Sequence, residues 1–347
     1  MMNNTNLCAV KQQHMFTAVL FCLVLLLGLF LNVFSMWVFC CRMPEWKAGT
    51  VLQFHLAISD VIVCPLGPVI VLYFAQGKYF WDTFWRVTCR LKIILMTVHF
   101  YGSIFFLTLI SIHRYVSVVY HHQDSRMKQK DFVHKLCLGV WVAVFLKGIL
   151  LVSFFDSSSN NGNITICLYI HQGQTTEMCF AINFILVIFG FLIPFTVSVV
   201  CYSRLVWSVS GISVCHPKGK LIKRKSHKMV TACLVIFGLC FMPMNVVRIA
   251  MVVVKFFFPK NCDLLDGVEV AYFVTWIVSL INCSLDPLIY CFASQKFTKA
   301  VRSSLRKIRV HIQTARQDAE EDSGLTTHVR PATGTITGKR MTMTDTR

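Results

Sequence analysis

Long apolar stretches separated by short polar loops repeat along this chain. Seven of them reach about 20 residues, the length that a helix needs to cross a membrane. Lipid offers no hydrogen-bond partners, so each stretch is expected to form a helix. The predicted spans are residues 15–41, 50–74, 90–119, 134–155, 179–208, 227–255 and 266–292. The pattern therefore predicts an all-α membrane protein, a seven-transmembrane helix bundle.

The third apolar stretch reaches from one water interface to the other. As a helix, the 25 residue steps from Cys89 to Arg114 would span roughly 38 Å. The apolar core of a bilayer is only about 30 Å thick. A helix with an oxidisable thiol at one interface and an arginine at the other is typical of a device that connects the two sides.

The segments outside the bundle are predicted to be polar. Residues 1–14 form a short N-terminal segment, and residues 15–292 hold the seven spans. An amphipathic helix at 293–310 is expected to lie on the membrane surface, because its apolar side chains share one face. Residues 311–347 are rich in Thr and are predicted to be disordered.

Composition supports a membrane protein, since 55% of the residues are hydrophobic and only 14% are charged. A net charge of +18 would indicate nucleic-acid binding in a soluble protein. Here the basic residues cluster in short loops on one side of the spans, which indicates topology and contact with membrane lipid rather than nucleic acid. The positive-inside rule places that side in the cytoplasm and the N-terminus outside, and predicts a multi-pass protein of the plasma membrane. Two N-glycosylation sequons, at Asn3 and Asn163, fall on the predicted outer side.

Five cysteines lie at or near the predicted outer face. A bond between Cys89 and Cys167 would tie the third span to the second outer loop. A bond between Cys8 and Cys262 would tie the N-terminus to the start of the seventh span. Cys179 is left over and could compete with Cys167, so the pairing stays open at this point.

Polar residues at mid-membrane depth cost about 2.5–3.5 kcal/mol each, so their presence needs a reason. They occur in the first, second, third and seventh spans: Asn32, Asp60, Ser103, Asn282 and Asp286. Facing the bundle interior, they could surround a small cation. They could equally form a water-filled hydrogen-bond network that joins the helices.

Several motifs, in order along the spans, resemble those of the rhodopsin-like (class A) G-protein-coupled receptors. They are Gly28-x-x-x-Asn32, Leu56-Ala57-x-x-Asp60, Cys89, Arg114-Tyr115, Trp141, Pro194 with Tyr202, Phe237-x-x-Cys240-Phe241-x-Pro243 and Asp286-Pro287-x-x-Tyr290. The resemblance implies a Na⁺ site at Asp60, Ser103, Asn282 and Asp286. It implies a packing switch at Pro194, Ile104 and Phe237. It also implies a cytoplasmic trigger made of Arg114, Tyr202 and Tyr290.

Within this family the chain is most similar to the hydroxycarboxylic acid and oxoeicosanoid receptors, on residues 37–40, 102–108 and 240–249. Two positions depart from the pattern. His113 stands where the family usually has an acidic residue before Arg114, which predicts raised basal signalling. Phe100 stands where hydroxycarboxylic acid receptors place an arginine, which argues against very small acids as ligands.

The candidate ligand contacts are cations in the outer halves of the spans, Arg248, Lys92 and Lys147. They are accompanied by a mainly aromatic lining, which comprises His99, Phe100, Tyr101, Phe241 and Tyr272. An arginine can hold a carboxylate by two parallel hydrogen bonds, although a cation can also simply extend to the membrane surface. The combination predicts a small anionic ligand, an oxidised fatty acid or another carboxylate.

The predicted function is thus a receptor that binds an extracellular anionic ligand and activates a heterotrimeric G protein, of the inhibitory class. The resemblance adds arrestin and receptor kinases as partners. The alternatives are a receptor for nucleotides or peptides and a non-signalling decoy. A channel or transporter is disfavoured because the chain shows no inverted repeat, and an enzyme because no catalytic constellation is present. Beyond an allosteric Na⁺, no cofactor is expected.

Overall fold

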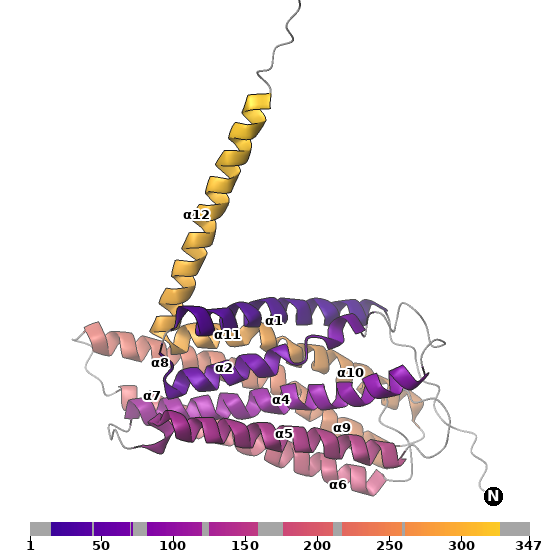
Figure 1. Cartoon of the computed structure of the whole chain (residues 1–347). Helices are drawn as coiled ribbons and strands as arrows, with labels where there is room; N and C mark the ends of the chain where they lie inside the picture. The colour runs from indigo at the N-terminus through magenta and orange to yellow at the C-terminus, as the bar shows by residue number, and fades with distance from the viewer. Residues whose placement is uncertain are drawn as a thin grey trace, which may run out of the picture. The chain divides into compact units, whose positions relative to one another are not determined.

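The structure, a computed structural model, describes residues 15–43, 45–69, 71, 82–119, 125–158, 176–210, 217–258 and 261–326. Within these ranges the side chains of some helical residues, Cys89 and Cys179 among them, are not described. The described residues form helices and their connections, and seven helical segments are long and apolar enough to cross a membrane (Figure 1). The predicted all-α bundle is confirmed.

Most spans consist of one long helix or of two helices in series. The first four spans contain α1 (Met15–Arg42), α2 (Ala48–Val61), α4 (Asp82–Val119) and α5 (Lys130–Ser158). The last three contain the pairs α6 (Thr176–Val187) with α7 (Ile193–Ser210), α8 (Pro217–Ile236) with α9 (Met242–Phe257), and α10 (Cys262–Leu280) with α11 (Asn282–Ala293). Between α4 and α5 lies the short helix η1 (Arg126–Lys128).

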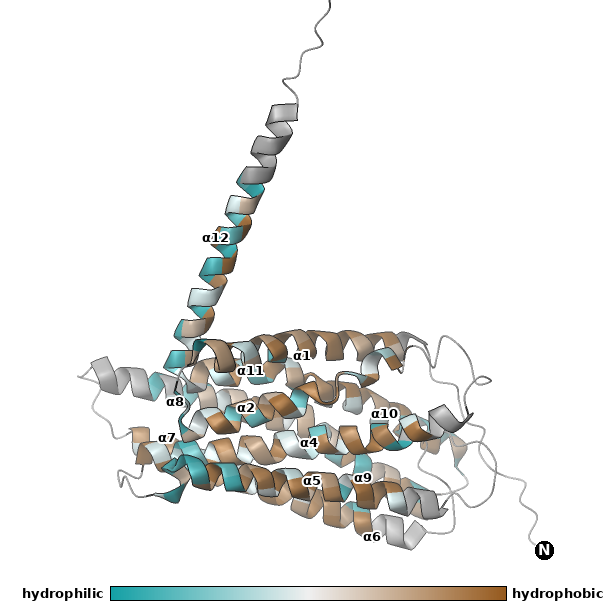
Figure 2. Cartoon of the chain, in the orientation of Figure 1, coloured by the Kyte–Doolittle hydropathy of each residue, from teal (hydrophilic) through white to brown (hydrophobic). Residues whose placement is uncertain are grey.

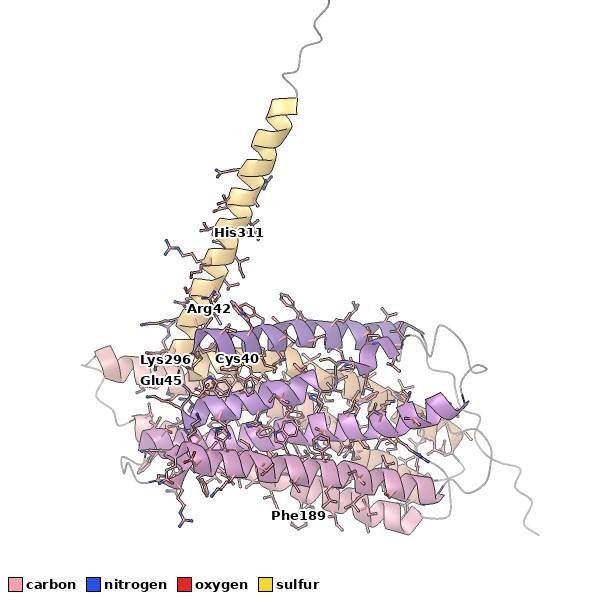
Figure 3. The ribbon with its side chains drawn as sticks, in the orientation of Figure 1. Cys40, Arg42, Glu45, Phe189, Lys296 and His311 are labelled. Atoms are coloured by element: carbon pink, nitrogen blue, oxygen red, sulfur yellow. The ribbon has the colours of Figure 1, made fainter. Side chains whose placement is uncertain are left out.

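Helix α4 lies at the centre of the bundle and packs against α2, α5 and α7. Its most apolar window is 72% buried, compared with 17% for that of α5, which therefore presents most of its surface outward. Figure 2 shows hydrophobic residues along the length of the spans and hydrophilic ones gathered where α5 begins. Exposed apolar side chains such as Phe189, 63% exposed, point away from the bundle (Figure 3). An outward apolar surface of this kind fits contact with lipid.

Two spans contain a π-helical turn immediately before a proline. The turns are η2 (Ile188–Leu192) before Pro194 and η3 (Phe237–Phe241) before Pro243. A proline ring clashes with the carbonyl group four residues earlier, and here that carbonyl lies inside the π turn. The wider turn relieves the clash without ending the span.

The second and seventh spans are each interrupted, where the sequence pattern had predicted continuous stretches. After α2 the chain makes tight turns, with Cys64 N donating to Val61 O at 3.1 Å, because Pro65 cannot continue the helical ladder. The seventh span breaks at Ile281, between α10 and α11. The break lies at the polar centre described below.

The last helix corrects the prediction of a helix at 293–310 followed by a disordered tail. Helix α12 runs over Gln295–Thr326. Residues 311–326 contain helix-favouring Ala, Arg, Gln and Glu and no proline, which explains the longer helix. Residues 1–298 and 299–347 form two compact units. In the second, apolar side chains of α12 such as Leu305 and Ile312 are exposed. Residues 327–347 lie outside the described part.

Candidate functional site

Two cations meet around one phenol in the half of the bundle opposite Arg114. Arg248 on α9 donates from Nη1 to the hydroxyl oxygen of Tyr101 on α4 at 2.5 Å. The Lys147 Nζ, on α5, lies 2.9 Å from the centroid of the same ring. The Arg248 guanidinium also lies 5.7 Å from the centroid of Phe100. We call these four residues the Arg248 cluster.

The surroundings of the Arg248 cluster make room for both cations. A Cβ atom at Gly190 would collide with the ring of Tyr101 and would come within 3.1 Å of the Lys147 Nζ. Phe241 contacts Phe100 with a centroid distance of 5.3 Å, and Tyr272 lies close to the Arg248 guanidinium. In the described part of the chain no carboxylate forms an ion pair with Arg248 or Lys147. Positive charge is therefore concentrated in an aromatic setting.

Two of the predicted ligand contacts lie elsewhere. Lys92 is buried with its Nζ 4.7 Å from the ring centroid of Trp276, apart from the Arg248 cluster. The prediction of His99 as a ligand contact is wrong, because its ring is only 1% exposed and faces Asp60. Adjacent residues of a helix point about 100° apart, so Phe100 and His99 face different neighbours.

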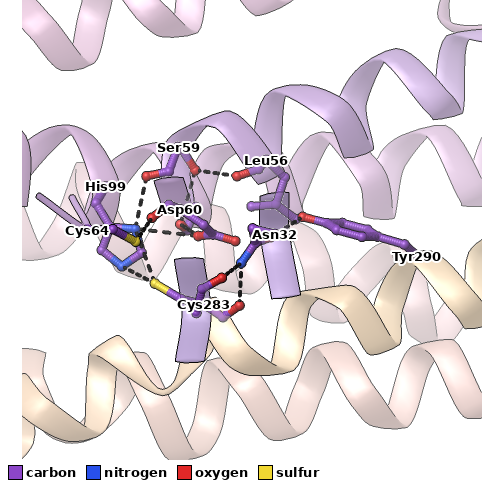
Figure 4. A network of polar contacts seen from close by, with 10 residues as sticks. Asn32, Leu56, Ser59, Asp60, Cys64, His99, Cys283 and Tyr290 are labelled. Atoms are coloured by element: carbon purple, nitrogen blue, oxygen red, sulfur yellow. Dashed lines mark hydrogen bonds and ion pairs between the residues drawn. The ribbon is translucent and has the colours of Figure 1, made fainter. Parts of the chain in front are cut away.

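A buried polar centre joins α2, α4 and α11 (Figure 4). Ser103 Oγ donates to Asp60 Oδ1 at 3.3 Å, and His99 Nδ1 lies 3.5 Å from the same oxygen. Asn32 Nδ2 donates to the carbonyl oxygen of Cys283 at 2.6 Å, which ties α1 to α11. The structure thus places Asp60 and Ser103 together, as the sequence predicted.

The remaining predicted cation ligands, Asn282 and Asp286, are fully buried at the same centre. Asp286 lies beside Asp60 and Asn282. In the described part of the chain, no hydrogen bond reaches Asp60 Oδ2, either carboxylate oxygen of Asp286 or the amide of Asn282. Buried carboxylate oxygens without a donor are unstable unless positive charge neutralises them. Chemically, the centre is suited to hold a cation.

The predicted packing switch lies between this centre and the basic end. Pro194, Ile104 and Phe237 are all buried. Thr108, one turn after Ile104, donates to Pro194 O at 3.4 Å, and Phe237 packs against Phe195 at 5.8 Å. Side chains of α4, α7 and η3 therefore meet here across the bundle.

The end of the bundle that carries Arg114 is hollowed by a cavity of about 380 Å³. Helices α2, α4, α7 and α8 all contribute to its lining, which includes Gly49, His113, Arg114, Leu205 and Met229. The glutamate and lysine of the rim, Glu45 and Lys296, form an ion pair at 3.7 Å (Figure 3). A cavity at the ends of several helices changes shape when those helices move.

The predicted trigger residues divide between two places. Tyr202 is buried close to Arg114. Tyr290 instead approaches Asn32, with its hydroxyl group 3.5 Å from Oδ1, and packs on Phe39 at 5.5 Å. Tyr115, next to Arg114, is half-buried. The structure therefore groups Arg114 with Tyr202 but not with Tyr290.

Comparison with known proteins identifies the family. The chain matches the model of the family described as 7 transmembrane receptor (rhodopsin family) over residues 31–290. This chain belongs to the rhodopsin family of seven-transmembrane receptors. A receptor function, and not an enzymatic one, follows from the family.

Named relatives of this receptor come from two groups. It is 31% identical to human purinoceptor 2, over 80% of this chain and 73% of the relative. It is 29% identical to mouse lysophosphatidic acid receptor 6, over 84% of each chain. With the chicken lysophosphatidic acid receptor 6 it shares 30% identity, over 83% of this chain and 93% of the relative. These relatives do not show the predicted hydroxycarboxylic acid branch, which stays a prediction.

The outer disulfides and glycosylation sites of the receptor are described only in part. Cys262 is disulfide-bonded. Its predicted partner Cys8, the residue Cys167, and the side chains of Cys89 and Cys179 lie outside the described residues. The sequons at Asn3 and Asn163 lie outside them as well, so the pairing and the glycosylation remain predictions.

Two residues of these sites were missed from the sequence. Cys283 precedes Asp286 by three residues, a spacing that places both on one helix face and could have indicated its role. Gly190 gave no signal, because a glycine shows its purpose only when the ring it accommodates is known.

Proposed function

We propose that this receptor binds an anionic ligand at the Arg248 cluster and in response activates a heterotrimeric G protein. The observation that carries the proposal is the pair of cations, Arg248 and Lys147, around Tyr101 without a carboxylate partner in the described residues. Two uncompensated cations in a largely desolvated site attract an anion far more strongly than they would in water.

The ligand that fits this cluster has an acidic head and an apolar body. A carboxylate or a phosphate can form two parallel hydrogen bonds with an arginine, and a second cation nearby favours a head with up to two negative charges. The rings of Phe100 and Phe241 provide an apolar wall. We therefore propose an anionic lipid, either an oxidised fatty acid or a lysophospholipid. The second class is favoured by relatives named for lysophosphatidic acid.

A nucleotide is the second candidate ligand, because other relatives are named purinoceptors. A purine base can stack on aromatic rings while its phosphates meet the two cations.

We place the outer end of the bundle outside the cell, on the basis of the basic loops at the opposite end. The cavity beside Arg114 would then face the cytoplasm, where a G protein, of the inhibitory class, and later arrestin and receptor kinases would act. We also propose that Na⁺ binds at Asp60, Ser103, Asn282 and Asp286, since the buried carboxylate oxygens there lack donors. A ligand shifts such a two-state bundle by binding one state more tightly.

The ligand proposal is tested with oxidised fatty acids, lysophosphatidic acid and nucleotides as agonists, read out as agonist-driven nucleotide exchange on a G protein. Arg248→Ala should lower the potency of the active compound roughly ten- to a hundredfold, because charge-assisted hydrogen bonds contribute about 1.5–3 kcal/mol. Arg248→Lys should restore only part of the potency, since the charge remains but the two-pronged geometry is lost.

The matched control is Arg90→Ala, which removes an exposed arginine at the outer end of α4. It should leave potency unchanged, and all variants should reach the cell surface equally. An agonist whose potency is indifferent to both Arg248 substitutions would show that Arg248 is not the anchor.

A further inference from the structure

Three side chains with different metal-binding atoms converge in the buried polar centre. Asp60, His99 and Cys283 come from α2, α4 and α11, and each is at most 1% exposed. One ligand atom of each, a carboxylate oxygen, a ring nitrogen and a thiol sulfur, lies within 4.8 Å of the other two. Figure 4 shows the three pointing toward one another.

The orientation of the His99 ring leaves one nitrogen directed at the thiol. Nδ1 lies 3.2 Å from the carbonyl oxygen of Ser59. A histidine that ligates a metal usually donates its other N–H to such an acceptor. With Nδ1–H donating to Ser59, Nε2 presents its lone pair, and Nε2 lies 3.5 Å from Cys283 Sγ. Two ligands of a tetrahedral Zn²⁺, with bonds of about 2.05 and 2.3 Å, are separated by about 3.6 Å.

The carboxylates next to this pair supply the charge that a divalent cation requires. Asp60 Oδ2 and both oxygens of Asp286 are buried and accept no hydrogen bond from the described residues. The polar centre therefore contains orphaned acceptors beside the imidazole and the thiol. An ordinary thiol–imidazole hydrogen bond would satisfy His99 and Cys283 but would leave these oxygens without a partner.

The identity of the donors decides which class of cation fits. The Na⁺ proposed above uses oxygen ligands from Asp60, Ser103, Asn282 and Asp286, and neither His99 nor Cys283 belongs to that set. Imidazole nitrogen and thiolate sulfur select softer ions such as Zn²⁺ over hard ones. We propose that Asp60, His99 and Cys283, with Asp286 as the fourth ligand, form a Zn²⁺ site.

Zinc binding at this site has two consequences. The thiol of Cys283 loses its proton to solvent when the Zn–S bond forms, so the ligands become two carboxylates, a neutral imidazole and a thiolate. The ion would also link α2, α4 and α11 and stabilise the arrangement of the bundle in which these helices lie together. Na⁺ and Zn²⁺ share both aspartates and exclude each other. The inference does not depend on the ligand of the Arg248 cluster.

The test uses the purified full-length receptor, stripped of metals with a chelator and titrated with ZnCl₂. All variants carry Cys40→Ser and Cys41→Ser, because those two thiols are exposed and would bind zinc independently. Binding stoichiometry and the apparent melting temperature are measured, so no agonist is required. The parent should bind one Zn²⁺ and should melt at a higher temperature with zinc, and added NaCl should weaken the binding.

Two ligand variants and one control separate a metal site from a hydrogen bond. Cys283→Ser and His99→Asn should each weaken zinc binding more than tenfold, yet Cys283→Ser should keep any stabilisation by Na⁺. Cys137→Ser removes another buried, free cysteine, on α5, and should bind zinc like the parent. The proposal is overturned if the parent binds no zinc, or if both ligand variants bind it as tightly as the parent. If one variant does not fold, the other alone decides.

Discussion

At the scale of single residues, His113 is the most unusual member of the cavity beside Arg114. Its ring lies against α2, where a Cβ atom at Gly49 would come within 2.7 Å of Cε1. Its Nε2 lies 3.4 Å from Ser117 Oγ, one turn later on α4. The imidazole therefore fits into a space that only a glycine leaves open, and it brings no negative charge to the neighbourhood of Arg114.

We expect His113→Asp to reduce ligand-independent signalling. A carboxylate next to Arg114 would attract the guanidinium and favour the conformation in which the two lie together. An effect of about 1 kcal/mol would lower basal nucleotide exchange roughly fivefold. His113→Asn is the control, because it has the same shape without the charge. If both variants lower basal exchange equally at matched expression, the charge has no role.

The cation proposed at Asp60 leads to a second prediction for single residues. Na⁺ should lower agonist affinity by stabilising the inactive state, and Asp60→Ala should abolish that dependence. Agonist binding is measured in NaCl and in choline chloride at equal ionic strength, which separates a specific site from screening. Equal Na⁺ sensitivity in the variant and the wild type would leave only a structural network at the polar centre.

At the scale of elements, close helix contacts decide how α1 meets α11. A Cβ atom at Gly28 would lie 2.7 Å from the Cβ of Cys283, which the backbone of α11 holds in place. One turn later, Asn32 donates to the carbonyl oxygen of Cys283. The glycine brings the two helices close enough for this hydrogen bond to form.

We expect Gly28→Ala to destabilise the receptor by about 1–3 kcal/mol, the usual effect of overpacking, and to lower its apparent melting temperature. Gly139→Ala on α5 is the matched control, because a Cβ atom there would meet nothing within 4 Å. It should be neutral or should stabilise its helix by up to about 1 kcal/mol. If the two variants melt at the same temperature, the contact with Cys283 does not limit the packing.

At the scale of the whole molecule, the seven spans and both candidate sites lie within residues 1–298, which form one unit. The second unit, residues 299–347, contains most of α12 and the Thr-rich end of the chain. The division predicts that signalling to a G protein and later regulation depend on different parts of the chain.

We expect truncation after Thr326 to spare G-protein activation and to slow internalisation. The cut leaves α12 complete and removes a segment in which each phosphorylated Thr would carry up to about −2 charge for a basic partner such as arrestin. Full-length receptor with the seven Thr from 327 onward changed to Ala is the control for chain length. Normal internalisation of both variants would contradict the prediction.

The sequence by itself determined the seven spans, their order and the central place of the third span. These follow from apolar length and from motifs such as Asp286-Pro287, which local chemistry and the lipid environment impose. Asp60 and Ser103 could be paired in advance because both are polar residues at the same membrane depth.

Only the tertiary structure decided which side chains meet. It assigned His99 to Asp60 rather than to the ligand, because a rotation of about 100° between neighbouring helix residues is invisible until the partner helices are placed. It also brought Lys147 and Arg248, 101 positions apart, to the same ring of Tyr101. Such pairings depend on helix rotation and close packing at Gly28 and Gly190, and no local pattern encodes them.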